Sequence, residues 1–273
     1  MATRHRNIEA KSFLDTAFST CSSPQNVEVV MFVDDDDNTY DIFDSPFSDT
    51  HILRGPRKNL PYHLRACANV SKGEILFFVN DDSVVQTDAW DEEIIKVHRG
   101  IKDSIYLCYP NDCFKGKNLA VFPIMSKFCY DKFEFFPVNY KGAFSDTHIH
   151  EIFRILAALG YDRIIFREDI IFRHNHYRIT GKKPDRTYTD RERFGDDITF
   201  LKGVRSRFKT ASLIRSFLNG KEKFEKKLDG EIVLENIIPS ILFYIFKFPG
   251  NYNYRIGLGI KLSLRYIYRT LFG

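Results

Sequence analysis

Acidic side chains stand directly after an apolar run in the first third of the chain. Residues 75–79 are all apolar, and Asn80, Asp81 and Asp82 follow them. Five consecutive apolar residues predict a buried central strand of a mainly parallel sheet, because both faces of such a strand are covered. Ligands bind at the carboxyl ends of these strands, where carboxylate and amide oxygens suit Mg²⁺ or Mn²⁺. An acidic turn of structural use is the alternative.

A second apolar run ends in the same way. Residues 26–33 predict another strand, and four aspartates at 34–37 follow it. Such acids can accept hydrogen bonds from a nucleobase or a ribose. The sequence contains neither GxxxxGK[ST] nor GxGxxG, which disfavours a P-loop hydrolase and a dinucleotide enzyme. A bound metal ion would therefore have to neutralise the phosphates of a nucleotide.

Helices and strands alternate between residues 8 and 109, which predicts a doubly wound α/β fold with helices on both faces of the sheet. The predicted helices span residues 8–20, 60–70, 88–98, 126–133, 146–159 and 198–218. The predicted strands span residues 26–33, 52–53, 75–79, 104–109, 119–124, 163–166 and 170–176. His174 and His176 alternate on the last of these strands and should share one face.

Composition excludes several classes of protein. With 273 residues, 44% of them hydrophobic and 28% charged, the chain fits one globular α/β domain with an appendage. Its five cysteines show no CxxC spacing, which argues against a zinc knuckle or a disulfide framework and for a reducing cytosol. We find no signal-peptide pattern and no apolar run near the ~20 residues of a membrane span.

The positive charge is concentrated at the C-terminus. Residues 236–273 carry five bases and no acid, so the remaining chain has a net charge of −1 within the total of +4. That distribution disfavours nucleic-acid binding. A helix over residues 254–272 would align Lys261, Arg265 and Arg269 along one side, next to Leu258, Leu262, Tyr266 and Ile267. We expect this tail to lie on an anionic membrane surface, at the inner face of the membrane. The alternative is that it packs as ordinary helices on the rest of the protein.

Several short motifs occur in an order that resembles the GT-A glycosyltransferases, especially glycosyltransferase family 2. They are TRHR at 3–6, VDDDD at 33–37, KGE at 72–74, LFFVNDD at 76–82, KGAF at 141–144, SDTHIHEI at 145–152 and FRHNH at 172–176. The resemblance covers about two-thirds of the chain. It implies a GT-A-like catalytic domain over residues 1–200, with a nucleotide-sugar half to about residue 110 and an acceptor half beyond it. Residues 201–273 would form a helical extension.

The resemblance also implies roles for individual residues. Asp82 would be the main metal carboxylate, with Asp81 beside it, and Asn80 stands where many members have an acid. The metal shell would be completed by His174 or His176, between which the sequence does not choose. The remaining donor-binding positions are Thr3 and Arg6 in the first motif, Asp34 or Asp35 facing the nucleobase, Arg54 and Arg57 on the diphosphate, and Gly142 in the glycine loop.

Asp146 is the candidate catalytic base. It stands at the start of a predicted helix, where the helix dipole stabilises a carboxylate, and direct displacement needs such a group to take the proton of the acceptor hydroxyl. A structural N-cap is the alternative. His148 and His150 are expected to be exposed residues of the same helix.

The sequence thus predicts a transferase dependent on Mn²⁺ or Mg²⁺ that moves a sugar from a nucleoside diphosphate sugar, UDP-linked by the resemblance, to a hydroxyl of a glycan or lipid-linked acceptor with inversion. A metal-dependent phosphoesterase or nucleotidyltransferase, and a non-catalytic nucleotide- or carbohydrate-binding module, are the alternatives. Members of the family begin with an apolar strand before the TRxR-like segment, whereas only Met1 and Ala2 precede Thr3 here. We expect an upstream start or another segment in the place of that strand.

Overall fold

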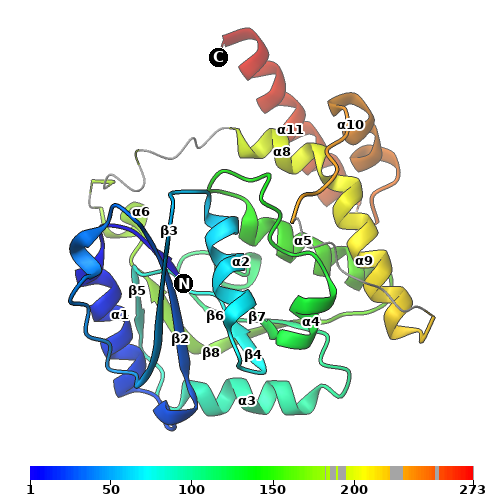
Figure 1. Ribbon diagram of the computed structural model, residues 1–273. Helices are drawn as coiled ribbons and strands as arrows, with labels where there is room; N and C mark the ends of the chain where they lie inside the picture. The colour runs from blue at the N-terminus through cyan, green and yellow to red at the C-terminus, as the bar shows by residue number, and fades with distance from the viewer. Residues whose placement is uncertain (182, 185–188, 190–194, 222–229, 250–251, 273) are drawn as a thin grey trace.

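A computed structural model describes residues 1–181, 183–184, 189, 195–221, 230–249 and 252–272 (Figure 1). Its first sheet contains three parallel strands in the order β1 (Ala2–Thr3), β2 (Glu28–Asp34) and β3 (Asp49–Gly55). Helices α1 (Asn7–Ser19) and α2 (Leu60–Val70) connect these strands to one another and to the next sheet. Both helices lie where their periodicity predicted them.

The second sheet has five strands of mixed direction. Its order is β4 (Ile75–Phe77), β7 (Ile124–Ser126), β6 (Leu107–Asn111), β8 (Ile164–His174) and β5 (Ser83–Val85). Only β6 and β8 are parallel neighbours, and the other pairs are antiparallel. The expectation of a central parallel strand at residues 75–79 was wrong in this respect: β4 ends its sheet and pairs antiparallel with β7, because an apolar run reports burial and says nothing of its partners.

Alternating side chains of the strands pack against helices on both faces, which confirms the predicted α/β fold. Met31 and Val33 of β2 share an apolar cluster with α1 and with α3 (Trp90–Gly100), whereas Val30 and Phe32 contact α2. The period of two along a strand explains this division. A third cluster joins the second sheet to α4 (Lys127–Lys132) and α5 (Ser145–Ala158).

Two further expectations about strands need correction. The stretches 163–166 and 170–176 were predicted as two strands, but they form the single strand β8. His176 lies beyond its end, as the N-cap of the short helix α6 (Tyr177–Thr180). The strand predicted at 119–124 is shifted to β7. Short 3-10 turns complete the described elements at Pro24–Asn26, Asn38–Tyr40 and Gly116–Asn118.

The C-terminal helices pack on the α/β part of the protein through a buried polar network. These helices are α8 (Asp196–Lys202), α9 (Val204–Leu218), α10 (Ile237–Phe246) and α11 (Tyr252–Phe272). Arg207 of α9 is fully buried, with Nε 3.1 Å from Oε1 of Glu151 on α5, and its guanidinium contacts the Tyr244 hydroxyl of α10. Burial disfavours its charge, but Glu151 and Tyr244 raise the pKa of Arg207. None of the described helices is long and apolar enough to span a membrane. The domain boundary near residue 200 stays a prediction.

Candidate active site

Asp82 and His174 meet where β5 begins and β8 ends. Asp82 lies in the turn between β4 and β5, and His174 is the last residue of β8, in register with Ser83. The main chain holds the two segments together, since the N–H of Asn175 donates to the Asp82 carbonyl at 2.8 Å. The His174 Nε2 lies 3.1 Å from the Asp82 Oδ1. Strand pairing therefore brings a carboxylate and an imidazole 92 residues apart in sequence into direct contact.

His174 has the environment of a metal ligand. Its side chain is buried, and neither ring nitrogen makes a hydrogen bond of ordinary geometry among the described residues. A buried imidazole without such a partner is costly. A divalent cation shared with the Asp82 carboxylate would satisfy it, because imidazole nitrogen and carboxylate oxygen are both ligands for Mn²⁺. The residues present thus fit the metal that the sequence predicted.

Asp81 binds the first loop of the chain. Its two carboxylate oxygens accept from Thr3 Oγ1 at 2.8 Å and from Arg6 Nη1 at 2.9 Å. Burial raises the pKa of Asp81 to about 6, with Arg6 acting in the opposite direction and Asp82 adding repulsion. The predicted donor residues Thr3, Arg6 and Asp81 are therefore one hydrogen-bonded unit.

Arg6 links that unit to the Asp82–His174 pair. Its Nη1 is also 3.7 Å from Oδ2 of Asp82, and both side chains are almost fully buried. A guanidinium beside two carboxylates limits their mutual repulsion. Arg6 thus contacts both Asp81 and the predicted metal carboxylate Asp82.

Asp34 forms a second polar group, at the end of β2. Arg4 Nε lies 3.2 Å from one carboxylate oxygen, and His63 Nε2 of α2 lies 3.7 Å from the other. Burial raises the pKa of Asp34, whereas the charges of Arg4 and Arg57 oppose that rise. Burial also lowers the pKa of His63 to about 4, so this ring is neutral near pH 7. Arg4 and His63 were not among the predicted site residues.

The other predicted donor residues occupy separate places. Asp35 is exposed in the turn after β2. The guanidinium of Arg54 donates to the Asp37 carbonyl at 3.2 Å and to the Asp41 carboxylate at 2.7 Å, so the structure directs it to the turn after β2. Arg57 follows β3 and acts on Asp34 through its charge.

His176 lies close to His174 on a different element. The centroids of the two rings are 5.3 Å apart, and the ring of His176 stacks on Phe114 and Tyr177. Its Nδ1 accepts from the N–H of Arg178 at 3.2 Å, as the cap of α6. His174, in direct contact with Asp82, is accordingly the better placed of the two predicted metal-binding histidines.

The glycine loop before α5 is anchored by an aspartate from the C-terminal part of the chain. The carboxylate of Asp196, which is fully buried, accepts from the N–H groups of Lys141, Gly142 and Ala143 at 2.7–2.9 Å. Asp146 lies three residues beyond this loop, in the first turn of α5, and accepts from its neighbour Thr147. Asp196 therefore positions the segment that carries the predicted base.

Sequence reasoning missed Asp112, which follows β6 at the same edge as His174. Its carbonyl accepts from the N–H of His174 at 3.0 Å, and its Oδ1 accepts from three successive N–H groups at 114–116. Its Oδ2 is buried without a hydrogen bond among the described residues. The available signal was an acid three residues after the strand predicted at 104–109, whereas Asp34 directly follows its predicted strand.

The expectation that His148 and His150 are exposed was wrong. Both are buried, because α5 is covered on more than one side. His148 Nδ1 is 2.9 Å from the Tyr140 hydroxyl, and His150 Nδ1 accepts from the N–H of Ala120 at 2.9 Å. Burial lowers the pKa of both rings, that of His150 to about 4. They contribute to the core and not to the acidic site.

A second possible metal site lies at the other end of the first sheet. The side chains of Glu28, Asp49 and His51 place ligand atoms within 4.8 Å of one another. Glu28 and Asp49 begin β2 and β3, whereas Asp34 ends β2. Two of the three residues are exposed, and exposed acidic groups of this kind are common without an ion.

Comparison with known proteins supports the fold. No protein-family model and no curated protein match the sequence. Among solved structures, the mannosyltransferase PcManGT from Pyrobaculum calidifontis, in complex with GDP-Man and Mn2+, matches with a TM-score of 0.50 and 12% identity. The match covers 96% of this chain and 72% of that one. At this identity the likeness is one of fold, and this chain shares the α/β fold of a glycosyltransferase.

Proposed function

We propose that this protein is a metal-dependent glycosyltransferase that moves a sugar from a nucleoside diphosphate sugar to a hydroxyl acceptor. The contact between Asp82 and His174, beside Arg6, carries the proposal. It joins a carboxylate, an imidazole and a guanidinium at one buried point, which suits a cation and a diphosphate together. The shared fold with a mannosyltransferase that binds GDP-Man and Mn2+ supports it.

Different residues would bind the metal ion, the phosphates and the nucleoside. Asp82 and His174 would hold Mn²⁺ or Mg²⁺, and the ion, when bound, would neutralise the diphosphate and stabilise it as a leaving group. Arg6, fixed by Asp81, donates to the phosphates. Asp34 accepts from the nucleobase or ribose; the resemblance implies uracil, and the matched mannosyltransferase binds a guanine nucleotide.

Asp146 is the proposed base, and inversion is the proposed stereochemistry. Its position in the first turn of α5 favours the carboxylate form. A carboxylate within reach of the acceptor hydroxyl takes its proton as the oxygen attacks the anomeric carbon, and the nucleoside diphosphate leaves from the opposite face. The loop anchored by Asp196 would hold this carboxylate in place.

Product analysis tests the reaction class. Incubation with Mn²⁺, a panel of UDP- and GDP-linked sugars and a panel of glycan and lipid-linked acceptors should release nucleoside diphosphate only when an acceptor is present. Formation of nucleoside monophosphate and sugar phosphate would identify a phosphoesterase or nucleotidyltransferase instead. Donor binding without any product would identify a binding module.

The C-terminal helices suit an anionic membrane surface as the place of the acceptor. Ile238, Leu242 and Phe246 are exposed at intervals of four on α10. On α11 the exposed apolar residues are Ile260, Leu264, Ile267, Tyr268 and Leu271. Lys261 and Arg265, both exposed, stand next to the second stripe, which is the pattern of a helix lying in a bilayer interface. The side chains of Leu258, Leu262 and Arg269 lie outside the part of the chain that the structure describes.

Flotation with anionic vesicles tests this placement. Truncation before α10 would remove the buried Tyr244, so substitutions on the exposed surface are the sharper test. Lys261→Gln with Arg265→Gln, and separately Leu264→Gln, should weaken vesicle binding, whereas Ile42→Gln, at a fully exposed site on the first half, should not. Equal flotation of all these proteins would contradict a membrane-bound tail. A location at the cytoplasmic face of a membrane remains a prediction.

A further inference from the structure

Ser83 begins β5 directly opposite His174, the last residue of β8. The N–H of Asn175 donates to the Asp82 carbonyl, which makes Ser83 and His174 a non-hydrogen-bonded pair of the antiparallel ladder. The side chains of such a pair lie on one face of the sheet, with Cβ atoms about 4.5–5.5 Å apart. The Ser83 hydroxyl and the His174 ring therefore face the same side.

Both side chains are buried, and both have unsatisfied polar atoms. Ser83 is 2% exposed and His174 is 5% exposed. Neither the Ser83 Oγ nor the two ring nitrogens of His174 make a hydrogen bond of ordinary geometry among the described residues. Burying a hydroxyl or an imidazole in this way is costly. One hydrogen bond between the two side chains would satisfy an atom of each.

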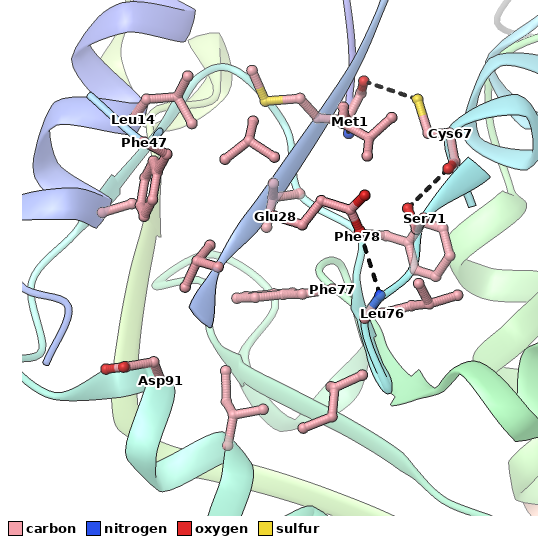
Figure 2. A pocket seen from close by; sticks show the side chains of 18 of the residues that line it. Met1, Leu14, Glu28, Phe47, Cys67, Ser71, Leu76, Phe77, Phe78 and Asp91 are labelled. Carbon is pink, nitrogen blue, oxygen red and sulfur yellow. Dashed lines mark hydrogen bonds between the residues drawn. The ribbon is translucent and has the colours of Figure 1, made fainter. Parts of the chain in front are cut away.

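The rest of this face is apolar. Phe172 lies two residues before His174 on the same face of β8, and the centroid of its ring is 4.9 Å from that of Phe77 and 5.5 Å from that of Trp90. All three aromatic residues line an apolar cavity of about 220 Å³ (Figure 2). Within the paired residues of β5 and β8, the hydroxyl of Ser83 is thus the polar group that shares a face with His174.

The main chain of His174 is fixed, which leaves its ring as the part that can turn. Its N–H donates to the Asp112 carbonyl at 3.0 Å, and the N–H of the next residue donates to the Asp82 carbonyl at 2.8 Å. Neighbouring segments on both sides therefore hold the backbone, and only the two side-chain torsions direct the imidazole. A partner for Nδ1 would decide where Nε2 points.

We infer that Ser83 positions His174 for metal binding. Its Oγ accepts a hydrogen bond from the Nδ1–H of the imidazole, so that the lone pair of Nε2 is directed at the cation shared with Asp82. A histidine that binds a metal through one nitrogen almost always donates from the other, and that bond sets the tautomer and the orientation of the ring. The inference rests on the proposed function, because it assigns a role within the metal site that Asp82 and His174 would form.

Mn²⁺ binding to the protein alone, measured from the EPR signal of the free ion, tests this role without any turnover. Ser83→Ala removes the acceptor and should weaken Mn²⁺ binding about tenfold or more, whereas Ser83→Thr keeps a hydroxyl and should restore most of the affinity. Because Ser83 acts through His174, adding Ser83→Ala to His174→Ala should cause no further loss.

Thermal unfolding without metal separates positioning from a structural role. Ser83→Ala removes a buried hydroxyl that has no partner, so the metal-free Tm should stay equal or rise. Ser126→Ala is the matched control, because Ser126 is also buried but its hydroxyl donates to the Ser104 carbonyl at 2.6 Å and accepts from the N–H of Cys129 at 2.9 Å. This control should lower the metal-free Tm by roughly 2 °C or more and leave the Mn²⁺ affinity unchanged.

Each other result overturns the inference. Unchanged Mn²⁺ affinity in Ser83→Ala, or equally weak binding in Ser83→Ala and Ser83→Thr, would show that the hydroxyl does not direct the ring. A lower metal-free Tm in Ser83→Ala would make Ser83 a structural residue. Weak binding in Asp112→Asn but not in Ser83→Ala would assign the acceptor to the unbonded Oδ2 of Asp112.

Failure of the proposed function has a different signature. If the parent protein binds no Mn²⁺, the metal site itself is removed, and the role of Ser83 goes with it. If the parent binds Mn²⁺ and loses this binding in Asp82→Asn but not in Ser83→Ala, the metal site stands and only the role of Ser83 is refuted.

Discussion

Buried histidines should make this fold sensitive to mild acid, and His150 provides the clearest case. Its ring is buried in α5, where Nδ1 accepts from the N–H of Ala120. Burial lowers its pKa from 6.5 to about 4, and the positive charge of Arg154 adds to the effect. The folded state therefore keeps the ring neutral, whereas the unfolded chain takes up a proton near pH 6.5. The contribution of His150 to the stability of the fold is therefore complete above about pH 6.5 and is lost as the pH falls toward about 4.

The magnitude follows from the two pKa values. Each pH unit between them is worth about 1.4 kcal/mol, so His150 alone costs about 3 kcal/mol once the pH is at or below 4. Between pH 7.5 and pH 5 its share of the loss is about 2 kcal/mol by the same relation. This is a large fraction of a typical domain stability of ~5–15 kcal/mol.

Urea unfolding at pH 7.5 and pH 5.0 measures this loss of stability. His150→Gln keeps a side-chain acceptor for Ala120 but cannot take up a proton, so the variant should lose about 2 kcal/mol less stability than the parent between the two pH values. If His150→Gln and the parent lose the same stability, the ring is not held neutral by burial and the reasoning is wrong.

Three further predictions test other parts of the account. Arg207→Met should destabilise the protein by about 3–5 kcal/mol, because it leaves the buried Glu151 carboxylate without its cationic partner, and adding Glu151→Gln should recover much of that loss in the same urea assay. Asp146→Asn should lower kcat by about 10²–10⁴-fold with donor affinity nearly unchanged; loss of affinity alone would make it a binding residue. Asp196→Asn should lower kcat more than donor affinity if it positions the loop before Asp146, and an unchanged kcat would dismiss that role.

The sequence predicted the local features of this fold well. Helix α2 has the predicted bounds, and α5 begins and ends within one residue of its prediction, because the spacing of apolar residues reports directly which helix face is covered. Asp34 ends β2, and Asp82 lies in the turn between β4 and β5, so both acids follow strands as the apolar runs before them predicted. Partners remote in sequence could not be predicted. Three examples are the antiparallel pairing of β4, the burial of His150 and the bonds from Asp196 to the glycine loop. Each depends on a segment 30 to 55 residues away, and such remote partners produce no periodic pattern in the sequence.

The site shows the same limit. Sequence could nominate Asp81 and Asp82 together, but only the structure separates them, with Asp81 bound to Thr3 and Arg6 and Asp82 beside His174. The choice between His174 and His176 likewise depends on where β8 ends. β8 ends at His174, and His176 belongs to the following helix α6, a boundary that the residue pattern did not indicate.

Calorimetric titration of the donor with and without Mn²⁺ tests the central claim most directly. The parent protein should bind a nucleoside diphosphate sugar tightly with Mn²⁺ and much more weakly with EDTA. Asp82→Asn should abolish the difference, whereas Asp49→Asn, in the acidic group at the opposite end of β2 and β3, should preserve it. Metal-dependent donor binding that survives Asp82→Asn, or that disappears in Asp49→Asn, would contradict a transferase site built on Asp82 and His174.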